Sequence, residues 1–155
     1  MNLKDLVNLA GTHARTVMIG LQQDLVPVWL CIDKDGQPVI IATPWSNDRE
    51  KALAKRKMKT YMRDHGIDSY SFVTEAWQAT VPAGTDLDEL TESDRPTNRA
   101  DRIEVVVACA TDNAHAEWRM WKTIRNSKGQ VVDLERLQTD SEREPEGWMR
   151  DMLDF

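Results

Sequence analysis

Two strongly β-prone segments, residues 70–81 and 103–111, constrain the fold of this chain more than any other feature. They read Tyr-Ser-Phe-Val-Thr-Glu-Ala-Trp-Gln-Ala-Thr-Val and Ile-Glu-Val-Val-Val-Ala-Cys-Ala-Thr, and a polar, acidic stretch separates them. Aromatic and β-branched side chains favour extended backbone because they pack well on a pleated surface. The two segments therefore predict an antiparallel pair of strands at the centre of a sheet.

Helical and strand patterns on either side of this pair complete an α+β domain. Apolar residues recur at helical spacing over residues 3 to 23 and 47 to 65. The remaining predicted strands are residues 26–32, 38–43, 117–125 and 131–137. The resulting order is α-β-β-α-β-β-β-β with short hairpin connections. It predicts a mainly antiparallel sheet of about six strands with the two main helices on one face.

The composition fits one cytoplasmic domain, expected at residues 1–140, with an acidic and apolar tail at 141–155. The chain has 155 residues, of which 41% are hydrophobic and 30% charged, which is ordinary for a globular protein. No apolar run approaches the ~20 residues needed to span a bilayer, and the N-terminus lacks the pattern of a signal peptide. We therefore expect no membrane contact and a reducing environment. Cys31 and Cys109 are then buried thiols, although a disulfide between them is the open alternative.

The charge distribution sets one helix apart from the rest of the chain. The net charge of -6 argues against a general nucleic-acid surface. Residues 47–65 nevertheless hold seven Lys or Arg against three acidic residues, and such cations could meet phosphates. The residues for this alternative are Lys51, Lys55, Arg56 and Lys59, on the helical segment from Lys51 to Arg63. We prefer an ordinary solvated helix face, because the overall charge would repel a polyanion.

Glu75 is the best candidate for a catalytic or binding carboxylate. In a strand it points the same way as Val73 and Trp77, because side chains alternate from face to face. An acidic residue on an otherwise apolar face must be paired, hydrogen-bonded or shifted in pKa. A functional site is one reason for such an arrangement. The other, which we prefer, is a salt bridge to Arg102 or Arg119, or a solvated carboxylate at an edge.

Large apolar side chains supply the candidate binding residues, which are Trp77, Trp121, Trp148 and Phe155. An indole in a strand is usually part of the core, but an exposed one would mark a partner or ligand site. Trp148 and Phe155 belong to an apolar stripe in the tail, which could dock in its own domain, in a second copy or in a partner groove. The acidic stretch 82–101 lacks the spacing of an EF-hand, so we expect it to be solvated.

No metal ion or cofactor is predicted. His13, His65 and His115 stand outside any His-Glu-x-x-His or Cys-x-x-Cys pattern. The chain also lacks a phosphate-binding glycine-rich loop and a Gly-x-Ser-x-Gly sequence. We expect all three histidines to be structural.

Glu75-Ala-Trp77, followed by a polar stretch and Asp101-Arg-Ile-Glu-Val-Val-Val107, resembles a pattern in small phage and bacterial proteins. The likeness covers roughly a third of the chain. It implies the central strand pair and a mobile-element or bacterial origin, and it assigns no catalytic residues.

The leading hypothesis is a non-enzymatic binding or accessory protein that engages a protein partner or forms a homo-oligomer. An acidic protein can cover a basic surface by charge complementarity, so a phage-encoded inhibitor of a host factor is one version. The rival is a small enzyme, such as a hydrolase, that uses Glu75 as acid or base. No second titratable group stands at a persuasive spacing for it. Nucleic-acid binding through the helix from Lys51 to Arg63 is the second alternative.

Overall fold

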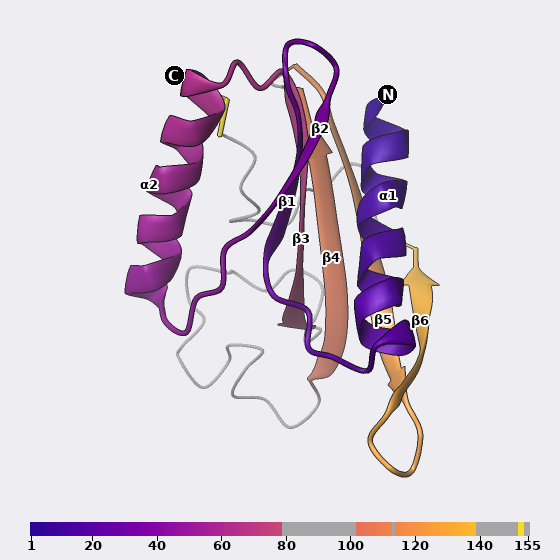
Figure 1. Ribbon diagram of the computed structural model, residues 1–155. Helices are drawn as coiled ribbons and strands as arrows, with labels where there is room; N and C mark the ends of the chain where they lie inside the picture. The colour runs from indigo at the N-terminus through magenta and orange to yellow at the C-terminus, as the bar shows by residue number, and fades with distance from the viewer. Residues whose placement is uncertain (79–101, 113, 139–151, 154–155) are drawn as a thin grey trace, which may run out of the picture.

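The computed structural model describes residues 1–78, 102–112, 114–138 and 152–153. Its six strands form one antiparallel sheet in the order β2-β1-β3-β4-β5-β6 (Figure 1). The strands are β1 (Val28–Ile32), β2 (Pro38–Ala42), β3 (Ser69–Gln78), β4 (Ile103–Thr111), β5 (Ala116–Arg125) and β6 (Val131–Leu137). The helices are α1 (Leu3–Arg15), the π-helix η1 (Thr16–Gly20) that continues it, and α2 (Asp48–Asp64). The predicted α+β class, the element order and the antiparallel sheet are confirmed.

The two β-prone segments form the middle of the sheet, as predicted. β3 and β4 pair from Tyr70 opposite Thr111 to Gln78 opposite Ile103. Glu75 lies opposite Val106 in this register. Both strands have another strand on their outer side, β1 next to β3 and β5 next to β4. Their valine-rich and aromatic composition therefore fits a strand pair that is enclosed on both edges.

The prediction that both helices lie on one face of the sheet is wrong, because α1 and α2 lie on opposite faces (Figure 1). α1 packs on a cluster that includes Leu30 of β1 and Val73 of β3. The neighbouring residues Trp29 and Phe72 point the other way and pack with α2. β1 is apolar on both faces, so each face needs a cover. α1 covers one face of β1 and α2 covers the other.

A complete cap starts α1, and one close contact fixes it on the sheet. The Asn2 side chain accepts a hydrogen bond from the Asp5 N–H at 2.8 Å, and the Asp5 carboxylate accepts one from the Asn2 N–H at 3.3 Å. This reciprocal capping box satisfies backbone donors that the helix leaves free. Further along, Gly11 lies so close to Trp121 that a Cβ there would be 2.7 Å from the indole. The glycine that weakens the helix pattern is needed for this packing.

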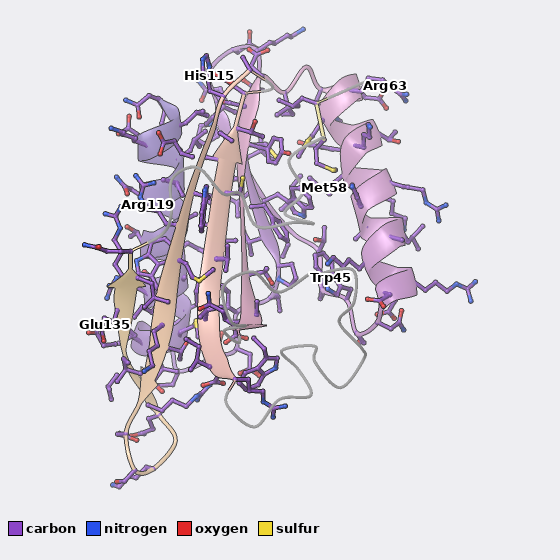
Figure 2. All side chains as sticks on the ribbon, turned by 180° about the vertical axis from the view of Figure 1, so that it is seen from behind. Trp45, Met58, Arg63, His115, Arg119 and Glu135 are labelled. Carbon is purple, nitrogen blue, oxygen red and sulfur yellow. The ribbon has the colours of Figure 1, made fainter. Side chains whose placement is uncertain are left out.

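α2 connects the edge hairpin to the central strands. β2 begins at Pro38 on the edge of the sheet, where the missing N–H costs no ladder bond. Gly36 turns the hairpin with φ of 77°. The Asn47 side chain then caps α2 by accepting a hydrogen bond from the Glu50 N–H at 2.8 Å. Met58 and Met62 are the buried residues of this helix, and Met58 lies between α2 and the sheet in Figure 2.

Both cysteines are free and buried. Cys31 lies on β1 and Cys109 on β4, and β3 runs between them. Because neighbouring strands are ~4.8 Å apart, two strand spacings exceed the reach of a disulfide. The thiol alternative holds and the disulfide does not form. Burial raises the pKa of the Cys31 thiol to about 12.

Part of the predicted tail docks in its own domain. Met152 and Leu153 are buried in the cluster that contains Met58 and Met62. The other tail residues, 141–151 and 154–155, lie outside the described part of the chain, as does the acidic stretch 82–101. Among the described residues, neither helix has the length and apolar character needed to cross a bilayer.

Candidate functional site

Glu75 lies in an acidic pocket at the end of the sheet face that α1 and η1 cover. Two adjoining cavities of about 240 and 300 Å³ share Asp24, Glu75 and Arg125 in their walls. Trp77 and Glu104 line the second cavity. We call these five residues the acidic pocket. They come from β3, β4, β5 and the segment after η1.

Burial and neighbouring carboxylates both act on Glu75. Its side chain is half-buried, and this desolvation raises its pKa above the ordinary value of 4.5. The negative charges of Asp24 and Glu104 raise the pKa further. Arg125 and the backbone N–H of Leu25 oppose these effects. Glu75 is thus a carboxylate whose charge is incompletely compensated.

Arg125 makes its direct contacts elsewhere in the pocket. Its Nε donates to Glu104 at 2.7 Å and its Nη2 to the same carboxylate at 3.2 Å. Its Nη1 donates to the Gly129 carbonyl at 2.7 Å. Such a two-pronged contact fixes the plane of the guanidinium. Glu75 therefore feels the charge of Arg125 without sharing its hydrogen bonds.

An irregular backbone segment brings Asp24 to the pocket. The π-helix η1 ends at Gly20, and Gln22 has a positive φ of 50°. The Gln22 amide donates to the carbonyls of Ile19 at 2.9 Å and Val131 at 2.8 Å. It also accepts from the Val131 N–H at 3.2 Å. π-helical turns and left-handed non-glycine residues are concentrated at functional sites, and here both adjoin a half-buried carboxylate.

Trp77 stands at the open side of this pocket with 39% of its surface exposed. The guanidinium of Arg102 lies over its ring, 4.4 Å from the centroid. The ring thus already takes part in a cation–π contact. Of the four predicted binding residues, Trp77 is the exposed one within the described chain.

The other predicted binding residues are placed differently. Trp121, also predicted as a binding residue, is only 7% exposed and packs beneath Gly11, so its indole belongs to the core. The reason is that α1 covers its side of β5. Trp148 and Phe155 lie outside the described residues. Arg119, predicted as a salt-bridge partner of Glu75, instead pairs with Glu117 at 3.1 Å.

The residues of the nucleic-acid alternative lie along α2, on the face of the sheet away from the acidic pocket. The side chain of Arg56 is exposed, and those of Lys51, Lys55 and Lys59 are partly exposed. The Lys51 ammonium lies 5.9 Å from the ring of Trp45. Leu53 and Trp45 border a shallow cavity beside this helix. The helix has the basic surface that the sequence predicts, and nothing in it distinguishes a phosphate site from a solvated face.

The histidines lie apart from the acidic pocket. His65 stacks on Tyr61 at 4.0 Å between ring centroids, and its Nδ1 is 3.0 Å from the Tyr61 carbonyl. His115 lies in the exposed turn between β4 and β5, beside Asp112 (Figure 2). Within the described chain, no group of three or more His, Cys, Asp or Glu residues is arranged to hold a metal ion.

Sequence reasoning found Glu75 and Trp77 but missed their surroundings. Asp24, Glu104 and Arg125 come from segments far apart along the chain. Glu104 shares a face with Arg125 because the strand register puts them on adjacent strands. The signals available in the sequence were Glu104, second in the β-prone segment 103–111, and Arg125, the last residue of the predicted strand 117–125.

Comparisons of this chain with models of protein families, with curated proteins and with solved structures find no match. The resemblance to small phage and bacterial proteins stays a prediction.

Proposed function

We propose that this chain is a non-enzymatic binding protein that takes a lysine or arginine side chain of a protein partner into the acidic pocket. The observation that carries the proposal is the surplus of carboxylates, since three of them face Arg125. A guest cation would stabilise the ionised forms of these groups and offset the desolvation of Glu75.

The aromatic wall of the pocket supports a cationic guest. Trp77 is partly exposed and lies next to Glu75 in the pocket lining. Its ring already accepts the guanidinium of Arg102. An indole beside carboxylates combines cation–π attraction with charge pairing, which suits a guanidinium or ammonium group.

The overall charge is consistent with a basic partner. A net charge of -6 would attract a positively charged surface and speed its approach. A phage-encoded protein that covers a basic host factor is one form of this proposal, and it depends on the resemblance described above.

The test is binding of peptides with one central lysine or arginine, selected from a library on the immobilised chain and measured by calorimetry. Glu75→Gln should weaken the best peptide about tenfold or more, the scale of a hydrogen bond to a charged group. Trp77→Ala should also weaken it. Affinity should fall as salt is raised.

The matched control is Glu135→Gln, which removes the same charge from an exposed position on β6 (Figure 2). It should leave peptide affinity unchanged. If no basic peptide binds, or if Glu135→Gln and Glu75→Gln weaken binding equally, the acidic pocket is not the binding site.

A small hydrolase is the second candidate function, and the raised pKa of Glu75 favours it. A carboxylic acid whose pKa is raised holds its proton more tightly, which favours a role in general acid catalysis. Asp24 would then be the second carboxylate. Chromogenic esters and glycosides should be turned over by the unmodified chain and not by folded Glu75→Gln. If neither protein turns any of them over, this candidate is rejected for those substrates.

A further inference from the structure

A second pocket lies at the other end of the sheet face under α1, and its charge is opposite. It has a volume of about 730 Å³. Its charged lining consists of Lys4 at the start of α1, Glu117 and Arg119 on β5, and Arg136 on β6. We call these four residues the basic pocket. Three cations against one carboxylate form a local positive surplus on a chain whose net charge is -6.

Arg119 is held in this pocket through its Nη1, and its Nε is a buried donor. Its side chain is 14% exposed and lies on the α1 side of the sheet (Figure 2). Its Nη1 donates to Glu117 at 3.1 Å and to the Trp118 carbonyl at 2.9 Å. Its Nε is buried and has no acceptor among the residues that the structure describes. A buried donor on a charged group is costly to leave without a partner, so an acceptor is expected at this position.

The two other cations of the pocket are available to a ligand. Lys4 and Arg136 are exposed, and within the described chain neither makes an ion pair with a carboxylate. Within the described ranges, the charges of Lys4 and Arg136 are therefore not neutralised by carboxylates. Glu117 neutralises part of Arg119, which still leaves the pocket positive.

We infer that the basic pocket binds the oxyanion group, carboxylate or phosphate, of a small molecule. The Arg119 guanidinium pairs with one oxygen, and Lys4 and Arg136 balance the remaining negative charge. A guanidinium fixed in its plane is well suited to oxyanions. Ala116, at the start of β5, also lines the cavity. This inference is independent of the acidic pocket and of the function proposed for it.

The experiment is a nuclear magnetic resonance titration that follows the Nε–H resonance of Arg119. Inorganic phosphate and acetate are added in separate arms, and sodium chloride at equal ionic strength is the reference. One of the two oxyanions should move the Arg119 resonance saturably, and the arm with the tighter binding identifies the group. A movement no larger than that caused by chloride in both arms would overturn the inference, because neither oxyanion would then bind beside the Arg119 guanidinium.

Substitutions in the basic pocket test whether the oxyanion binds there. Arg136→Gln and Lys4→Gln change exposed residues, so the fold should persist, and each should weaken binding about two- to fivefold. Arg119→Lys keeps the charge but removes the Nε–H, and should weaken binding at least about tenfold. The control is Arg56→Gln, an exposed cation on α2, which should change nothing. Equal loss in Arg56→Gln and Arg136→Gln would show a general charge effect and reject the site.

Discussion

The acidic and basic pockets lie on one sheet face. They differ in how completely the arginine of each pocket is paired with a carboxylate. β5 contributes to both, with Arg119 at one end and Arg125 at the other. Arg125 is fully engaged by Glu104 and Gly129, so Glu75 is left with the unbalanced charge. In the basic pocket Glu117 engages one nitrogen of Arg119, and across the described part of the chain the Nε has no partner. The comparison teaches that a single ion pair can fix a charged side chain and still leave a neighbouring group able to bind.

The largest expected effect comes from breaking the core between the two pockets. Trp121 lies on the same face of β5 as Arg119 and is packed against Gly11. Trp121→Ala should lower the free energy of unfolding by about 3–5 kcal/mol, because it removes a buried indole and leaves a cavity. Denaturant unfolding measures this. Trp77→Ala, at the exposed indole, is the control and should cost far less; equal losses would contradict the packing described for α1.

The second-largest effect is expected from removing Arg125 from the acidic pocket. Arg125→Gln removes the two hydrogen bonds to Glu104 and should lower the free energy of unfolding by about 1 kcal/mol, since the pair is partly exposed. It should also raise the pKa of Glu75 further, because Arg125 lowers that pKa. A carboxyl titration followed by nuclear magnetic resonance measures the shift. An unchanged pKa would show that Arg125 does not act on Glu75.

Glu75→Gln tests the unbalanced carboxylate itself, with an expected change of about 1 kcal/mol or less because solvent screens the group. Glu75 has a raised pKa when folded, so the folded state holds its proton more tightly than the unfolded state. Its contribution to stability is complete below the ordinary pKa of 4.5 and is lost as pH rises through the folded pKa. Glu75→Gln should remove this fall in stability and leave the protein at least as stable at neutral pH.

Unfolding curves at several pH values, for the unmodified chain and for Glu75→Gln, measure that difference. Glu135→Gln serves again as the control at an exposed position. If Glu75→Gln destabilises the protein at neutral pH, the Leu25 N–H and the charge of Arg125 outweigh the burial and the neighbouring carboxylates.

The smallest expected effect concerns the irregular turn beside Asp24. Gln22→Gly relieves the positive φ of 50° but loses the hydrogen bonds to Val131. These changes should nearly cancel and leave a net loss of a few tenths of a kcal/mol. Gln22→Ala keeps the strained backbone and should therefore be the less stable of the two by thermal unfolding. A more stable Gln22→Ala would show that the backbone there is not constrained.

Local patterns in the sequence predict the strands and helices well, and the layers less well. Alternation and β-branched residues located β3 and β4, and the polar turns located the hairpins. The placement of α2 was missed because the decisive signal lies in β1. Its run from Val28 to Ile32 is apolar without alternation, which indicates burial on both faces.

In the candidate site, too, local patterns predict single residues, and the tertiary arrangement decides which residues surround them. Periodicity alone predicted that Glu75 and Trp77 would share a face, and they line one pocket. The companions of Glu75 depend on the register of neighbouring strands and on the turn at Gln22. These are consequences of the complete sheet, and no local pattern encodes them. Whether an indole is covered, as at Trp121, is likewise decided by a helix distant in sequence.

The thin attachment of α2 has a consequence for how the molecule opens. Met58 and Met62 are its buried side chains, and methionine packs adaptably but specifies position poorly. Detaching this helix exposes little apolar surface compared with separating the central strands. Among the described elements, its amide hydrogens should exchange with deuterium through partial opening, well before those of β3 and β4.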